Sequence, residues 1–354
     1  SGGGAVRAPP LRAAVRPHVG RGVPVIARRV RAFGALRLGA YAATWVIWGS
    51  TYLAIRTAVA VVPPFLLAGV RSVVAGAILV GWGLAQGDER PRRGQVVAAL
   101  LTGAMFFLVG HGGLFWAEQR VASGPAALMI ATEHFWVLLA GSLLGIISAT
   151  WRAWAGVAIG LAGVGLLVGS GTGAIDPLGA AVLVVSAAAW GLGTLYFTGP
   201  RKPKSQPFAA GIPLLGGGVL LLMASAIAGE PSRFSVAEVT PLAAGALAYL
   251  IVFGSVVAFT AYSWLVEREG PSRALSFTYV NPLVAVLLGA AFLREPLTWR
   301  IALAAGAIVA AVVLIITGTR TAEKAGAAPA PASPPPLSPT PARPRRRRAK
   351  ARRP

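Results

Sequence analysis

Four ionisable residues lie inside long apolar segments of this sequence, where they could bind a substrate or carry a proton. They are Arg71, His111, Glu133 and His134. A charged side chain at the centre of a bilayer costs at least about 2.5 kcal/mol on insertion scales, so each is a candidate site residue by default. All four fall in the first half of the chain, which indicates that the two halves differ in chemistry.

Glu133 and its neighbour His134 allow two interpretations. Glu133 lies roughly 13 Å from the predicted outer end of its segment, at 1.5 Å per residue, which is close to the bilayer midplane. An unpaired carboxyl group in hydrocarbon takes up a proton more readily than one in water, as a proton carrier requires. If the Glu133 carboxylate pairs with Arg71, which lies at a comparable depth, it would stay ionised and have a structural role. Proton coupling and a buried structural pair both remain open.

Arg71 and His111 also have alternative roles. The planar guanidinium of Arg71 suits a substrate carboxylate, and it equally suits an ion pair between two helices. His111 is flanked by Gly110 and Gly112, so the backbone there can approach a ligand or another helix. A hydrogen bond across the bundle is the simpler role for His111.

The second half offers neutral polar and aromatic groups instead. Tyr279 and Asn281 precede a proline, which frees a backbone carbonyl near the midplane, as in many cavities. Trp48 and Trp190 occupy corresponding positions in the two halves, where they line a cavity or pack against other helices. Tyr262 is expected near the inner interface as an aromatic anchor.

The composition identifies a membrane protein. Of 354 residues, 55% are hydrophobic and 12% charged, against about 25% charged in soluble domains. Apolar blocks of about 20 residues suit helices that cross the bilayer. Ten such spans are predicted, at roughly 39–58, 65–85, 96–117, 124–147, 153–169, 177–198, 208–229, 241–266, 271–293 and 300–317.

The distribution of positive charge sets the orientation. With the N-terminus inside, the inner segments hold 27 Lys and Arg residues and the outer loops hold 4. The positive-inside rule therefore places both termini in the cytoplasm and the chain in the plasma (inner) membrane. Five spans per half is an odd number, so the second half enters the membrane upside down.

The two halves also resemble each other in sequence. At a constant offset, Trp264 and Arg268 fall on Trp116 and Arg120, and the run 298–300 falls on 150–152. Internal repeats of this kind point to a transporter built from two halves. We predict an all-α integral membrane protein of ten helices in two inverted five-helix repeats, at 38–170 and 171–318.

The two tails, 1–37 and 319–354, hold 18 of the 33 Lys and Arg residues and are rich in Pro, Gly and Ala. Such segments cannot bury a core, so we expect disorder. The basic run at 345–353 could bind RNA, but beside a membrane anionic lipid is the favoured partner, and we expect no nucleic acid.

Several runs resemble the drug/metabolite transporter superfamily, in particular its EamA type. They are WGSTYLAIR at 48–56, PPFLLAGVR at 63–71, WAEQ at 116–119, and YLIVFGSVVAFTAYSWL at 249–265 followed by YVNPLVAVLLG and REPLTWR. The resemblance implies ten helices around a central cavity and export of amino acids, other small metabolites or drugs by alternating access. The family's proline midway along the fourth span is replaced here by His134, so the first half has no proline to bend that helix.

The predicted function is a secondary-active exporter of small molecules, with proton coupling as one option. The alternative is a membrane scaffold without transport, whose basic tails bind lipid. An intramembrane enzyme using Glu133 and His134 lacks a nucleophile or metal partner in the sequence, and Cys is absent, so we expect no catalysis, cofactor or metal. Small residues along 156–165 make homodimerisation through that face a further option.

Overall fold

The computed structural model describes residues 2, 34–168, 175–197, 199–269 and 274–321, and within these the chain is almost entirely helical. Six helices there are long and apolar enough to cross a membrane, and three further apolar helices are shorter. Most of both predicted tails lies outside the described residues. The elements that follow the helical residues 34–42 are η1 (Ala43–Ile47), α2 (Trp48–Ala58), α3 (Pro64–Ala85), α4 (Arg93–Gly103), η2 (Ala104–His111), α5 (Gly112–Ala117), α6 (Ser123–Ile130), α7 (Glu133–Leu143), β1 (Ile147–Ala149), α8 (Trp151–Val168), α9 (Pro177–Phe197), α10 (Gln206–Ile227), η3 (Pro231–Arg233), η4 (Val236–Glu238), α11 (Pro241–Tyr249), η5 (Leu250–Val257), α12 (Ala258–Glu269), α14 (Phe277–Leu293), α15 (Trp299–Gly318) and β2 (Thr319–Thr321).

Proline and glycine set many of the helix ends. A proline occupies one of the first two positions of α3, α10 and α11, where its missing N–H has no intrahelical partner to lose. Gly87, Gly145 and Gly229 follow α3, α7 and α10 with positive φ, the conformation that ends helices at little steric cost. Gly145 places the end of α7 at Leu143, so the predicted fourth span, which continued to 147, is too long.

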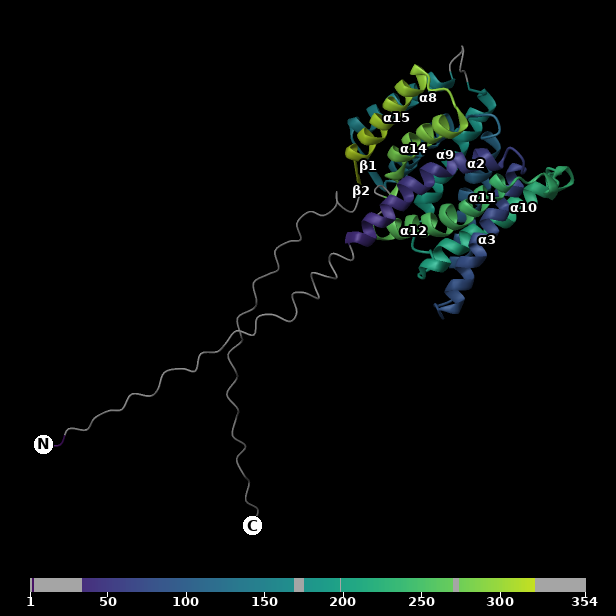
Figure 1. The fold of residues 1–354 in the computed structure, drawn as a ribbon. Coiled ribbons are helices and arrows are strands. Elements are labelled where there is room, and N and C mark those ends of the chain that lie inside the picture. Colours follow the sequence, from purple (N-terminus) through teal and green to yellow (C-terminus); the bar gives the residue numbers. More distant parts are fainter. Residues whose placement is uncertain (1, 3–33, 169–174, 198, 270–273, 322–354) are drawn as a thin grey trace.

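The bundle is organised around two long helix pairs. Helix α3 packs along α10, and α8 packs along α15. Figure 1 shows the α8–α15 pair at one end of the bundle and the α3–α10 pair at the other, with α2, α9 and α14 between them. Helix α2 contacts α14, and α9 contacts α6 and α7, so the central helices join the two pairs.

The fourth span is interrupted although it contains no central proline. Helix α6 ends at Ile130, two turn residues follow, and α7 begins at Glu133. The hydroxyl group of Thr132 donates to the backbone carbonyl of Met129, at 2.7 Å. This local hydrogen bond competes with the helical pattern and accompanies the break. The first half therefore bends without the proline on which the sequence comparison relied.

Both predicted tail boundaries need correction. Residues 34–37 are helical, and Thr319–Thr321 form β2, which pairs antiparallel with β1. In this pairing Ser148 lies opposite Arg320. The backbone hydrogen bonds of the two short strands join the end of α15 to the segment before α8.

Part of the small-residue face at 156–165 packs inside the chain. A Cβ added at Gly156 would lie 3.0 Å from Ile315, and one at Gly163 would lie 3.0 Å from Ile308, both in α15. Helix α15 thus covers Gly156 and Gly163, where small residues bring α8 and α15 together. A Cβ added at Gly160 would meet Phe135 of α7, and one at Gly165 would have nothing within 4 Å, so homodimerisation through this face stays a prediction.

We predict that Gly76→Ala destabilises the protein, because an added Cβ would lie 2.8 Å from the Cα of Leu215 and 2.9 Å from the carbonyl of Gly211 in α10. Overpacking of this kind costs about 1–3 kcal/mol. Thermal unfolding in detergent measures the loss.

Gly81→Ala in the same helix is the matched control, because nothing lies within 4 Å of its added Cβ. The alanine there should leave stability unchanged or raise it slightly, since Ala favours helix over Gly. Equal unfolding temperatures for the two variants would contradict the close packing of α3 on α10.

Candidate functional site

A small cavity of about 50 Å³ lies between the central helices. Its volume is sufficient for a few water molecules, and it is well below the roughly 300–1,000 Å³ of ordinary ligand sites. The conformation is therefore too closed to hold a metabolite. Six of the eight residues predicted for the site line it: Trp48, Arg71, His111, Glu133, Trp190 and Asn281.

Two π-helical segments of equal length border this cavity. Segment η2 ends at His111, and η5 contains Gly254 and Ser255. The wider turn of a π-helix leaves backbone groups and side chains free for other partners, and such segments are frequent at functional sites. Here the indole Nε1 of Trp48 donates to the carbonyl of Gly254 at 2.9 Å, and Nε of Arg71 donates to Oγ of Ser255 at 2.7 Å.

Aromatic rings form the walls of the cavity. The ring of Trp48 lies 5.8 Å from that of Trp190 and 4.7 Å from that of Phe277, both in edge-on geometry. Trp190 stacks on Phe106 at 4.5 Å and on His111 at 5.1 Å. Interlocked rings of this kind hold one another in place, so the shape of the walls is fixed largely by aromatic packing.

Glu133 is buried in this cavity without a partner. It is the first residue of α7, directly after the break in the fourth span, and its side chain is fully buried. Within the described residues neither carboxylate oxygen has a hydrogen-bond partner. Arg71 and Glu133 both line the cavity but form no ion pair, so the predicted structural pair of these two residues is wrong.

Two of the predicted site residues, His134 and Asn281, make contacts at α14, and Asn281 also lines the cavity. His134 is buried, and its Nδ1 lies 3.0 Å from Oγ1 of Thr278, at the interface of the fourth and ninth spans rather than in the cavity wall. With its nitrogen turned toward the neighbouring carbonyls, the Asn281 amide donates to Trp45 at 2.8 Å, which joins α14 to η1. Tyr279 lies in α14, and its side chain is outside the described part of the chain.

Sequence reasoning missed several cavity residues. Thr51 and Tyr52 line the cavity one turn after Trp48, and their spacing of three and four residues already places them on the same helix face. Tyr262 was expected at the inner interface, but it is fully buried. Its hydroxyl group lies 2.8 Å from Oγ1 of Thr194, and its ring lies 5.2 Å from that of Trp48. Depth counted along the sequence ignored the wider turn in the preceding η5.

At the predicted outer end, two carboxylates cap the starts of helices in the first half. Glu295 accepts from the backbone N–H and the hydroxyl group of Ser123, each at 2.9 Å, at the start of α6. Glu230 accepts from the N–H of Leu66 at 2.8 Å and of Phe65 at 3.2 Å, at the start of α3. Carboxylates at helix N-termini satisfy free N–H groups and complement the helix dipole.

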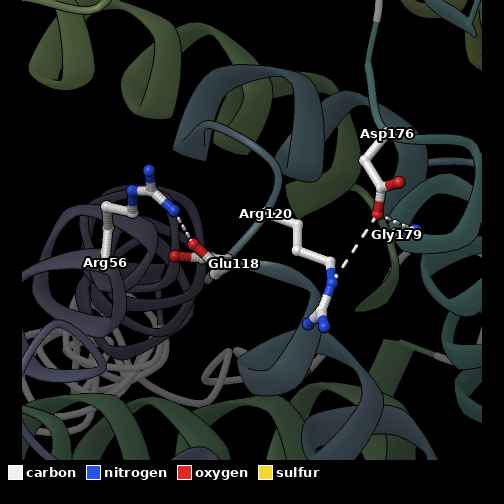
Figure 2. Close-up of polar contacts among 5 residues, drawn as sticks. All are labelled: Arg56, Glu118, Arg120, Asp176 and Gly179. Carbon is white, nitrogen blue, oxygen red and sulfur yellow. Dashed lines mark hydrogen bonds and ion pairs between the residues drawn. The ribbon is translucent and has the colours of Figure 1, made fainter.

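Two arginines add contacts at the same end (Figure 2). The guanidinium of Arg56 donates to the backbone carbonyl of Glu118, and Nε of Arg120 lies 3.9 Å from Oδ2 of Asp176. Asp176 in turn accepts from the N–H of Gly179 at 2.8 Å. These contacts tie α2, the segment after α5 and the start of α9 together above the cavity.

A bundle of long apolar helices around a cavity that contains a buried arginine and a buried glutamate defines a membrane transporter. The chain belongs to the EamA-like transporter family, whose model matches residues 38–169 and 177–317. Members of the family and the curated relatives are transporters, so this protein is a transporter and not an enzyme.

The curated relatives include proteins from bacteria, a plant and an archaeon. The uncharacterized inner membrane transporter YedA of Escherichia coli (strain K12) is 39% identical over 79% of this chain and 90% of its own. The uncharacterized transporter YvbV of Bacillus subtilis is 26% identical over 80% of this chain and 92% of its own. One crystal structure, 20% identical, aligns with a TM-score of 0.58 over 79% of this chain and 96% of that one, which supports the fold.

We predict that Glu295→Gln loosens the outer end of the bundle, because the charged cap of α6 is lost. A helix cap contributes about 0.5–2 kcal/mol, so opening should become roughly threefold to tenfold more frequent. The chain contains no cysteine. A thiol introduced by Ser186→Cys in the cavity wall can therefore report opening through its rate of reaction with a water-soluble maleimide.

The control is Glu238→Gln in the same background, because Glu238 is exposed in the loop between α10 and α11. It should leave the rate of maleimide reaction unchanged. A Glu295→Gln variant that reacts at the rate of the unchanged chain would show that the cap does not hold the cavity closed.

Proposed function

We propose that this protein is a secondary-active carrier that exports small metabolites, amino acids or drugs by alternating access of the central cavity, coupled to protons through Glu133. The observation that carries the proposal is the buried Glu133 carboxylate, which lines the cavity without a hydrogen-bond partner in the described chain. An ionisable group at this depth is costly to retain unless it works in transport.

The contacts between helices support two inverted repeats of five helices. Helix α2 contacts α14 and α11, and α9 contacts α7 and η2, their counterparts in the other half. Likewise α3 contacts η5, and α10 contacts η2. The family model also matches the chain twice, once in each half. A pseudo-two-fold axis in the membrane plane would generate such reciprocal contacts.

The two ends of the bundle carry related contacts, as alternating access requires. Glu230 follows α10 and caps the start of α3, while Asp88 follows α3 and accepts from the hydroxyl group of Ser205, at 2.6 Å, at the start of α10. The predicted inner end also has an ion pair of 3.6 Å between Lys202 and Glu267. In this mechanism one set of contacts breaks while the other holds, so the cavity opens to one side at a time.

The proposed orientation has both termini in the cytoplasm and the protein in the inner membrane. The excess of positive charge on the predicted inner segments supports it. The relative YedA is named as an inner membrane transporter. Export then means that the substrate enters the cavity from the cytoplasm and a proton reaches Glu133 from outside.

We predict that Glu133→Gln abolishes transport driven by a pH gradient, because glutamine keeps the size of the side chain but binds no proton. Purified protein in liposomes, tested with a labelled panel of amino acids, organic acids and amines, measures this. Accumulation driven by the gradient should fall at least about tenfold, as expected when a group essential for proton transfer is lost.

The exposed residue Glu238 again supplies the control, as Glu238→Gln, which should accumulate substrate like the unchanged chain. Gradient-driven accumulation by Glu133→Gln at the unchanged rate would refute proton coupling at this residue. An unchanged chain that moves no member of the panel would refute the carrier itself.

The alternative, a membrane scaffold whose basic tails bind anionic lipid, makes a different prediction for truncation. A chain ending at Thr321 keeps the β1–β2 pairing but loses most of the basic C-terminal segment. For a carrier, the truncated chain should transport in liposomes at the rate of the full chain. Removal of the basic residues should weaken the attraction of the protein to anionic vesicles, by about 1 kcal/mol for each Lys or Arg near the surface. Absence of transport by both the full and the truncated chain, together with vesicle binding that is lost on truncation, would favour the scaffold.

A further inference from the structure

Arg71 is the largest of the fully buried side chains, and it lines the cavity. It lies in the middle of α3, and only 2% of its surface is exposed. Its Nε donates to Oγ of Ser255 at 2.7 Å, and its guanidinium carbon lies 5.6 Å from the centre of the Phe115 ring. Within the described residues no carboxylate forms an ion pair with it.

An unpaired guanidinium in this position needs an anion. The group carries five N–H donors in a fixed plane and stays charged in proteins. Ser255 uses one donor, at Nε, and thereby fixes the plane of the guanidinium. The donors on the two Nη atoms have no hydrogen-bond partner in the described chain. Their parallel arrangement matches the two oxygens of a carboxylate. Since a buried charge without a partner is costly, a ligand that supplies the partner gains affinity at this point.

The charge of the cavity favours a single negative charge on the ligand. When Glu133 is protonated, one guanidinium balances one carboxylate, whereas a doubly charged phosphate would leave an excess negative charge in the cavity. A neutral or positively charged ligand would leave Arg71 without a partner. The residues therefore select a monoanion over a phosphate or an amine.

The walls define the rest of the ligand. Trp48, Trp190 and Phe277 present indole and phenyl rings to the cavity, and Trp190 is itself held by stacking on Phe106 and His111. Ring faces and edges gain most from another flat apolar group, by about 0.5–1.5 kcal/mol per ring pair beyond the area buried. A flat apolar body next to the carboxylate fits these walls.

We propose that the cavity binds small organic anions whose single carboxylate is held by Arg71 and whose flat apolar body lies among the rings of Trp48, Trp190 and Phe277. This inference rests on the proposed carrier function, because the closed cavity of about 50 Å³ must open before such a ligand can enter. Ser255 is then a positioning residue, since it acts by orienting the guanidinium.

Binding of a matched pair of probes tests this directly. Indole-3-acetate and indole-3-acetamide differ only in the carboxylate, and their dissociation constants for the purified full chain in nanodiscs can be measured by equilibrium dialysis. We expect the unchanged protein to prefer the acid at least about tenfold, as for a hydrogen-bonded charge, and to bind acetate and inorganic phosphate far more weakly.

The preference for acid over amide should disappear in Arg71→Gln and be reduced in Arg71→Lys, which keeps the charge but loses the paired donors. Ser255→Ala should weaken binding of the acid about tenfold to a hundredfold, as for one hydrogen bond to a charged group. The ratio of the two affinities does not depend on the folded fraction of a variant. Arg233→Gln on the exposed outer loop is the control and should keep the full preference.

Two results would overturn the inference: equal binding of acid and amide by the unchanged chain, or an acid preference that persists in Arg71→Gln. Transport in liposomes separates this inference from the carrier proposal. Gradient-driven transport of an amine without binding of the acid would refute the anion site and leave the carrier standing. Binding of the acid that depends on Arg71, without transport of any substrate, would refute the carrier and leave the site standing.

Discussion

Hydrocarbon offers no hydrogen bonds, so every polar group inside this bundle must find its partner within the protein. The outer end of the bundle meets this constraint by placing the carboxylates of Glu230 and Glu295 on the free N–H groups of α3 and α6. The same constraint makes the cavity unusual, because Arg71 has a single hydroxyl partner and Glu133 has no partner among the described residues. Buried polar atoms without a partner also occur away from the cavity, among them both carboxylate oxygens of Glu118, but Glu133 is the acidic side chain among them that lines the cavity.

The aromatic cluster and the π-helical segments position the polar groups of the cavity. Trp48 binds the carbonyl of Gly254, and the next residue, Ser255, holds Arg71. One turn of η5 therefore fixes both an aromatic wall and the cationic group of the cavity. A regular α-helix would use the carbonyl of Gly254 in its own ladder, so the wider turn supplies the acceptor that positions the indole ring. Packing and hydrogen bonding depend on the same few residues here.

Much of the architecture could be predicted because it follows from the length and polarity of segments. Apolar blocks bounded by proline, glycine or charge gave the helices nearly residue by residue, and buried charge identified Arg71, His111 and Glu133 as cavity residues. Features that depend on the neighbouring helix could not be predicted. Gly156 and Gly163 of α8 meet α15, and His134 turns to Thr278 although Glu133, its neighbour, lines the cavity. The break in the fourth span is accompanied by a hydrogen bond from the Thr132 hydroxyl group to a backbone carbonyl, for which no strong sequence pattern exists.

The difference between the two halves follows from these contacts. In the ninth span a neutral amide, Asn281, binds the backbone of Trp45 and fixes α14 against η1. In the fourth span the corresponding depth is occupied by Glu133, after a break that frees the start of α7 from the helix before it. A neutral group that is fully satisfied gives a rigid wall, whereas an ionisable group without a partner gains a partner only when a proton or a ligand arrives. In the proposed mechanism the ninth span is therefore the fixed side of the cavity, and the first half carries the groups whose state changes.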